Sequence, residues 1–168
     1  MLFLRRFISR VNRVACLVAG SLTLLIGLIV CYGVVTRYIL NRPIGWGEEV
    51  STYLMIWAAF LGAGYTMQMD GHIGVDVITR KLPEKVQDRL AYAKDLGGIL
   101  FLVLLAVKGF GDCALSIRLG ETSISELSIP MFIPQLSVPV GSILVALQLV
   151  EKLLARLDIA DRAGERRA

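Results

Sequence analysis

The sequence predicts an all-α integral membrane protein with four transmembrane helices, both termini in the cytoplasm, and short amphipathic helices at the membrane interface. Two observations lead to this prediction. First, residues 14–36, 50–69 and 127–150 contain no charged side chain, and a shorter uncharged stretch covers 96–107. A helix needs about 20 such residues to cross a hydrocarbon core of about 30 Å. We therefore expect spans near 14–36, 50–69, 90–110 and 130–150.

The second observation is the distribution of basic residues, which sets the orientation. Fourteen of the 18 Lys and Arg residues fall in the N-terminal segment, in the region from residue 80 to Lys94, and in the C-terminal tail. The opposite side has only Arg37, Arg42, Lys108 and Arg118. Because cytoplasmic loops carry the Lys and Arg excess, both termini are predicted to be cytoplasmic.

Composition leaves little room for a soluble domain, since 55% of the 168 residues are hydrophobic. The chain divides into an amphipathic basic segment (1–13), a four-helix transmembrane domain (14–155) and a charged cytoplasmic tail (156–168). The net charge of +4 suits anionic lipid headgroups and requires no nucleic acid. The first uncharged run is too long for the hydrophobic region of a signal peptide, so we expect it to be a retained anchor.

The N-terminal segment and the start of the second span both carry features typical of a membrane interface. Leu4, Phe7, Ile8 and Val11 recur at helical spacing among arginines, which predicts an interfacial amphipathic helix. Pro43, Gly45 and Gly47 are expected to interrupt helical structure before the second span. Trp46 suits the headgroup level. Glu48 and Glu49 complement the positive end of the helix dipole.

The second span and the loop after it hold further candidates. Trp57 lies inside the span, which favours burial between helices over exposure to lipid. Gly62 belongs to a small-residue face suited to close packing, either within this chain or against a partner. His72 and Asp76 are four residues apart, but neighbouring glycines argue against a regular helix. These two residues either fix the loop by local hydrogen bonds or contact a partner.

The third and fourth spans are irregular. Only 12 residues of the third stretch are uncharged, a rise of about 18 Å, so the helix must extend through Asp95 and Lys108. We expect Asp95 either to face protein or to lie at a shallow depth. A short interfacial amphipathic helix near Leu82–Leu90 either precedes this span or continues into it. Pro134 and Pro139 predict an irregular start to the fourth span.

The sequence argues against catalysis and against bound cofactors or metals. It has one histidine, three cysteines without a C-x-x-C pair, and no Walker-type phosphate loop. A membrane enzyme or redox subunit is therefore disfavoured. An independent homo-oligomeric channel or small carrier remains the alternative, but it requires a polar stripe along one helix, which the sequence does not show.

Several short motifs occur in a characteristic order. They are Trp46–Glu49, Tyr53–Trp57, Phe60–Gly64, Gly71–Asp76, Leu82–Pro83, Ile129–Pro130 and Val138–Gly141. Together they resemble the small permease subunit, of the DctQ type, of tripartite ATP-independent periplasmic (TRAP) transporters. The resemblance covers roughly residues 14–155, and four spans with cytoplasmic termini is the topology that it implies.

The resemblance also implies a function. Such transporters import organic acids with a sodium gradient and a periplasmic substrate-binding protein. The large multi-spanning permease subunit carries the substrate and ion sites, and the small subunit acts as its scaffold in the bacterial inner membrane. This chain is expected to be the separate rather than the fused form. Its partners would be the large subunit, the binding protein as a docking partner, and membrane lipids.

The residues that could form interfaces with these partners are Trp46, Glu48, Glu49, Trp57, Gly62, His72, Asp76, Asp95 and Pro139. Glu49 is the foremost candidate. Its carboxylate is expected to bind a basic partner, which is Arg37, Arg42 or a residue of the large subunit. In the simpler interpretation, Glu48 and Glu49 only complement the helix dipole, a contribution of about 0.3–1 kcal/mol each.

Overall fold

The structure is a computed structural model, which describes residues 2–42, 44–69, 84–125 and 127–165. Its helices are α1 (Leu2–Tyr38), α2 (Trp46–Gln68), α4 (Glu84–Leu119), α5 (Phe132–Gln135) and α6 (Ser137–Glu165). Four segments within these residues are long and apolar enough to cross a membrane: Arg6–Tyr38, Trp46–Gln68, Tyr92–Leu119 and Phe132–Ala155. The predicted all-α fold with four spans is confirmed.

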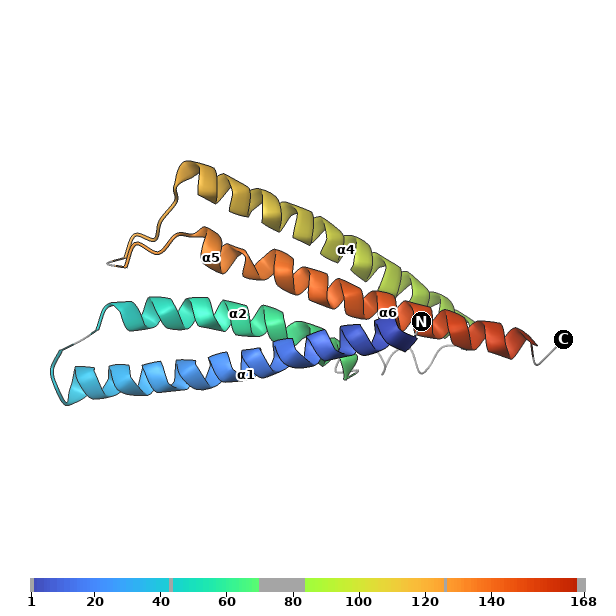
Figure 1. The fold of residues 1–168 in the computed structure, drawn as a ribbon, viewed down its shortest axis with the longest axis horizontal. Coiled ribbons are helices and arrows are strands. Elements are labelled where there is room, and N and C mark those ends of the chain that lie inside the picture. The colour runs from blue at the N-terminus through green and yellow to red at the C-terminus, as the bar shows by residue number, and fades with distance from the viewer. Residues whose placement is uncertain (1, 43, 70–83, 126, 166–168) are drawn as a thin grey trace.

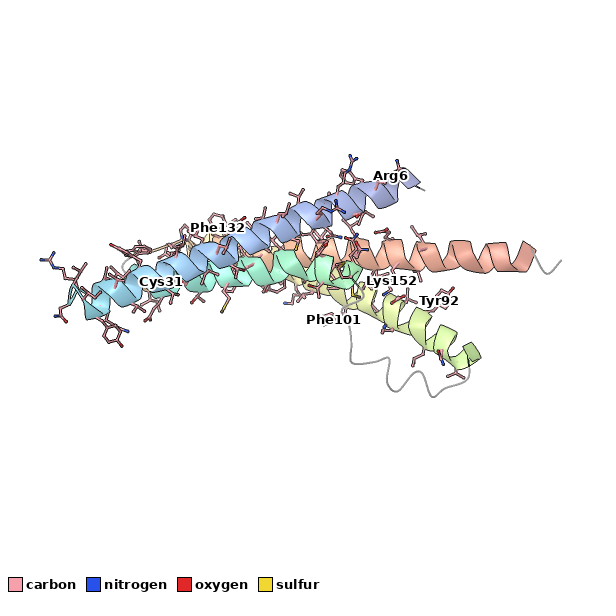
Figure 2. The ribbon with its side chains drawn as sticks, turned by 90° about the horizontal axis from the view of Figure 1, so that it is seen from below. Arg6, Cys31, Tyr92, Phe101, Phe132 and Lys152 are labelled. Carbon is pink, nitrogen blue, oxygen red and sulfur yellow. The ribbon has the colours of Figure 1, made fainter. Side chains whose placement is uncertain are left out.

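The helices form two antiparallel pairs, α1 with α2 and α4 with α6, which converge toward the end where both termini lie (Figure 1). Helix α6 contacts α1, α2 and α4, so it joins the two pairs. Figure 2 shows Arg6, Tyr92 and Lys152 toward this terminal end and Cys31 and Phe132 toward the other, which we call the turn end. The α1–α2 connection and the α4–α5 connection both lie at the turn end.

Close backbone approach holds the pairs together. A Cβ atom added at Gly98 in α4 would lie 3.0 Å from Leu149 Cδ1 in α6, and one added at Gly109 would lie 2.8 Å from Pro139 Cδ. A Cβ at Gly141 in α6 would lie 2.6 Å from the Phe60 Cβ in α2. Lipid provides no hydrophobic force between helices, so contacts of this kind carry much of the association.

Helix α1 continues without a break from the amphipathic N-terminal segment into the first span. Within that segment Phe7 is exposed, whereas Ile8 and Asn12 are buried. Helix α2 begins at Trp46, so Gly47 lies inside the helix and not in a break before it. Gly47 is buried because the Ile44 side chain packs directly against it, 3.3 Å from where a Cβ would stand.

The third helix is longer than the span predicted at 90–110. Helix α4 already runs from Glu84, in agreement with a continuous connection, and it ends only at Leu119. Its buried positions Ala106, Gly109, Cys113 and Ser116 follow one another at intervals of three and four residues. This buried stripe passes Lys108 unchanged, so the helix extends through Lys108 as predicted, and it continues beyond residue 110, where the span was expected to end.

The fourth span starts irregularly, as its prolines indicated. The four-residue helix α5 ends at Gln135, Leu136 caps it, and α6 starts at Ser137. The Ser137 hydroxyl donates to the Pro134 carbonyl at 2.7 Å, and both residues are buried. A side chain thus binds a carbonyl that the irregular backbone leaves available.

Candidate functional site

Glu49 lies on the first turns of α2, at the turn end, and joins α2 to the loop between α4 and α5. The Tyr53 hydroxyl donates to Glu49 Oε1 at 2.7 Å. The Ser125 hydroxyl donates to Glu49 Oε2, and Ser123 in turn donates to the Ser125 oxygen at 2.8 Å. In the described residues the carboxylate is thus bound by hydroxyl groups of this chain, and not by Arg37 or Arg42.

The α4–α5 loop is itself held in a defined shape. Thr122 and Pro130 form an antiparallel bridge, Ser123 N donates to Ile129 O at 2.9 Å, and Met131 N donates to Glu121 O at 3.0 Å. An open groove of about 600 Å³ lies between this loop and α2. Its lining includes Glu49, Tyr53, Glu121, Ile124 and Met131. The Ile124 side chain is fully exposed at the rim, so a large apolar group projects from the turn end.

The two tryptophans occupy different environments. Trp57 is partly buried, and its indole N–H donates to the Ile133 carbonyl of α5 at 3.1 Å. It therefore ties α2 to the irregular start of the fourth span. Trp46 is 37% exposed at the first position of α2, as suits a residue at the membrane interface.

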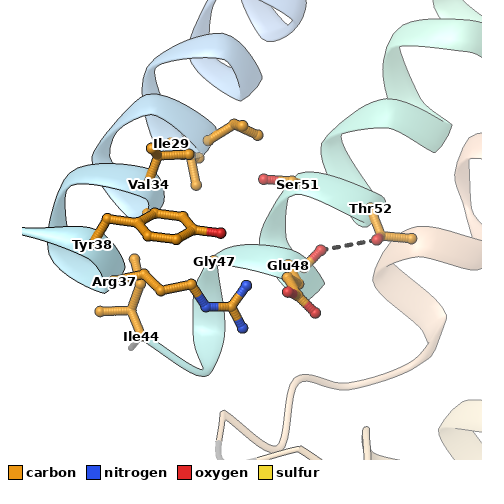
Figure 3. Close-up of a pocket in the computed structure, with 11 residues that line it drawn as sticks. Ile29, Val34, Arg37, Tyr38, Ile44, Gly47, Glu48, Ser51 and Thr52 are labelled. Atoms are coloured by element: carbon orange, nitrogen blue, oxygen red, sulfur yellow. Dashed lines mark hydrogen bonds between the residues drawn. The ribbon is translucent and has the colours of Figure 1, made fainter. Parts of the chain in front are cut away.

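Glu48 borders a second hollow at the turn end, between the last turns of α1 and the first turns of α2 (Figure 3). This cleft has a volume of about 450 Å³. The Arg37 guanidinium and the Glu48 carboxylate both point into it, and Tyr38 lies beside them. The hydrogen bond drawn among the lining residues joins the Thr52 hydroxyl to the Glu48 carbonyl at 2.8 Å.

The small-residue face of α2 packs within this chain. A Cβ at Gly62 would lie 3.8 Å from the Ala19 Cβ of α1, which is ordinary contact. Gly64 is far tighter, because a Cβ there would lie 2.6 Å from Asn12 Oδ1 and 3.4 Å from the Leu144 Cβ. The close approach of three helices therefore depends on Gly64 more than on Gly62.

Two further candidates lie in the interior of the bundle. Asp95 on α4 is only 1% exposed, so it faces protein. Pro139 is fully buried against Gly109 of α4. His72 and Asp76 lie outside the described residues. Elsewhere, among the described positions, no three His, Cys, Asp or Glu residues gather in a way that could hold a metal ion.

A polar network at the terminal end was not predicted from the sequence. Asn12 of α1 donates from Nδ2 to Gln148 Oε1 of α6 at 2.6 Å, and Gln148 Nε2 donates to Glu151 Oε2 at 3.0 Å. One turn away on α1, Ser9 accepts a hydrogen bond from Gln68 of α2 at 2.8 Å. Asn12 and Gln148 are 1% and 6% exposed. The available signal was Gln148 itself, an amide inside an otherwise apolar stretch.

Comparison of the sequence with known proteins places this chain in a family. Residues 26–158 match the family described as "Tripartite ATP-independent periplasmic transporters, DctQ component". A Haemophilus influenzae protein provisionally assigned as a TRAP transporter small permease is 29% identical over 155 residues, 92% of each chain. The C4-dicarboxylate TRAP transporter small permease protein DctQ of Rhodobacter capsulatus is 28% identical over 63% of this chain and 46% of its own length.

A third relative differs in its length. The isethionate TRAP transporter permease protein DctMQ of Oleidesulfovibrio alaskensis is 28% identical over 88% of this chain, but the match covers only 24% of that protein. In that relative the equivalent of this chain is therefore one part of a much larger permease. With four membrane-spanning helices and a family match over most of its length, this chain is a multi-pass membrane protein that belongs to the DctQ family of TRAP transporter small permeases, which are transport subunits and not enzymes.

Proposed function

We propose that this chain is the scaffold subunit of a sodium-coupled TRAP transporter that imports an organic acid across the bacterial inner membrane. It binds the large permease subunit, with both ends of the four-helix domain on the cytoplasmic side. A periplasmic substrate-binding protein would dock at the turn end. The fused DctMQ relative supports the partnership, since a single chain there contains a region similar to this one and a much longer remainder.

The observation that best supports a scaffold is the tightness of the contacts between the helices. Gly64, Gly98, Gly109 and Gly141 each lie where an added Cβ would be 3.0 Å or less from a neighbouring helix. These positions are spread over α2, α4 and α6. Helices that pack this closely are expected to form a rigid body. Such a body does not open a path for substrate between its own helices.

The outward faces support a partner in the membrane. Helices α1 and α4 carry rows of exposed apolar side chains, including Leu24 and Leu28 on α1 and Phe101 and Leu104 on α4. Among the described residues these faces are mainly apolar, and the charged side chains that α4 exposes beside them include Lys108 and Asp112. The apolar faces suit contact with lipid and with apolar helices of a larger permease.

The decisive experiment is affinity purification of this chain from native membranes in a mild detergent, followed by identification of bound proteins and by uptake assays. We expect a stoichiometric, larger multi-spanning permease. The pair, reconstituted in vesicles with the binding protein, should accumulate an organic acid only while a sodium gradient is present. Purification of the chain alone or as a homo-oligomer would contradict the scaffold proposal and favour the small channel. Uptake that survives collapse of the sodium gradient would contradict the proposed coupling.

A further inference from the structure

The cleft between α1 and α2 at the turn end has the chemistry of a site for one phospholipid molecule. Arg37 lies in the last turn of α1 and Glu48 lies on the first turn of α2, so a cation and an anion face the same hollow (Figure 3). In the described residues no ion pair or hydrogen bond joins the two side chains, and both are exposed. The two charges are therefore available to a ligand that itself carries both signs.

Apart from the charged pair, most of the residues that line the cleft are apolar. Ile29, Val30, Val34 and Ile44 line it, and Gly33 leaves space in its floor, since a Cβ there would have only Ile44 Cδ1 nearby, at 3.9 Å. From Arg37 back to Ile29 the helix rises about 12 Å. A hydrocarbon core of about 30 Å gives each leaflet about 15 Å. The cleft thus has a charged mouth at the interface and an apolar wall about one leaflet deep.

An unused hydroxyl group in the wall adds an independent indication of a ligand. Ser51 Oγ is buried and has no hydrogen-bond partner among the described residues. It lines the same cleft, one helical turn below Glu48 on α2. A buried polar atom without a partner costs free energy. A phosphate or ester oxygen of a lipid in the cleft would supply the missing acceptor.

We propose that this cleft binds a zwitterionic phospholipid with a primary amine, of the phosphatidylethanolamine type. Arg37 binds the phosphate, Glu48 binds the ammonium group, Ser51 donates to a phosphate or ester oxygen, and an acyl chain lies along Ile29 and Gly33. An anionic lipid without the amine would place its phosphate beside Arg37 but leave the Glu48 carboxylate without a cation. The site therefore selects the zwitterionic lipid over the anionic one.

The test is native mass spectrometry of the chain, with whatever subunit co-purifies, after transfer to nanodiscs of equal phosphatidylethanolamine and phosphatidylglycerol. We expect one retained phosphatidylethanolamine per copy of this chain. Arg37→Gln should weaken retention about tenfold, the effect of losing one hydrogen bond to a charged group. Glu48→Gln should abolish the preference for phosphatidylethanolamine, because the neutral amide neither attracts the ammonium group nor repels the anionic lipid.

A second pair of variants separates the cleft from the rest of the lipid-facing surface. Gly33→Leu fills the cleft without changing any charge and should remove the retained lipid. Gly27→Leu makes the same change six residues earlier on α1, where a Cβ would meet no described atom outside its own helix backbone within 4 Å, and should leave retention unchanged. Equal retention in Gly33→Leu and Gly27→Leu, or no preference between the two lipids in the unmodified chain, would overturn the proposal. Occupation of the cleft by a side chain of the co-purified subunit would overturn it as well.

Discussion

Gly141 marks the point where α2 and α6 come closest. The position where its Cβ would stand lies 2.6 Å from the Phe60 Cβ and 2.8 Å from the Phe60 carbonyl oxygen. The second of these atoms belongs to the backbone, so it cannot move aside by a change of rotamer. A methyl group at position 141 must therefore push α2 and α6 apart. The contact between these two helices joins the two helix pairs.

We expect Gly141→Ala to destabilise the protein by about 1–3 kcal/mol, the usual cost of overpacking. The matched control is Gly111→Ala on α4, where a Cβ would meet no described atom within 4 Å. That change should be neutral or stabilising by roughly 0.5–1 kcal/mol, because alanine is the better helix former. Thermal unfolding in detergent measures both. A Gly141→Ala protein as stable as the control would show that the helices can separate without cost.

The hydrogen bond between Asn12 and Gln148 is a second contact that depends on single residues. It joins α1 to α6 across 136 positions in the sequence. In a double-mutant cycle with Asn12→Ala and Gln148→Ala, we expect a coupling of about 0.6–1.7 kcal/mol, between the average and the maximum for hydrogen bonds between membrane helices. The cycle is measured by denaturant titration in micelles.

The control cycle for this prediction pairs Gln148→Ala with Ser21→Ala. The Ser21 hydroxyl donates only to the Leu17 carbonyl of its own helix, at 3.0 Å, and the residue is exposed. Its coupling to Gln148 should be close to zero. If the coupling between Asn12 and Gln148 were as small as that of the control cycle, the contact would not stabilise the packing of α1 against α6.

At the scale of elements, the α4–α5 loop depends on α2 for its position. Glu49 is the anchor, since its carboxylate accepts hydrogen bonds from Ser125 of the loop and from Tyr53 of α2. The backbone bonds of the loop hold its shape, whereas the Glu49 contact holds the loop against the bundle. We therefore expect the groove next to the loop to depend on both sets of contacts.

We expect Glu49→Gln and Ser125→Ala each to speed amide hydrogen exchange at Ser123 and Met131 by about tenfold, because one charge-assisted hydrogen bond is weakened or lost. The double variant should exchange about as fast as either single variant, since each of the three variants disrupts the same contact, between Glu49 and Ser125. Glu48→Gln is the control, as its carboxylate faces the other cleft. Faster exchange in Glu48→Gln, or unchanged exchange in the other variants, would contradict this role of Glu49.

The sequence predicted the elements better than their contacts. Charge-free stretches located four spans, because the cost of burying charge in a bilayer acts on each helix separately. Periodicity did not show that Glu49 would meet Ser125, 76 residues away, because the position of a loop against a helix depends on the whole bundle. Small residues indicated close packing correctly, but Gly64 could not be distinguished from Gly62 without the position of Asn12.

At the scale of the whole molecule, the charge distribution predicts that the terminal end lies in the cytoplasm and the turn end in the periplasm. We expect an impermeant maleimide to label Ile124→Cys in spheroplasts, and to label Arg6→Cys only after lysis. Arg6 lies toward the terminal end (Figure 2), Ile124 lies in the α4–α5 loop at the turn end, and both side chains are exposed. The background should carry Cys16, Cys31 and Cys113 as alanine. The reverse labelling pattern would overturn the orientation.

The unbroken course of α1 also makes the molecule responsive to bilayer thickness. Its uncharged residues 14–36 rise about 34 Å, a few ångströms more than a typical hydrocarbon core. A continuous helix cannot shorten, so the difference must be taken up by tilting or by local thickening of the lipid. Since α2 and α6 are bonded to the same helix at Ser9 and Asn12, a tilt of α1 turns its neighbours with it. A change in membrane thickness would thus reorient the bundle as one body.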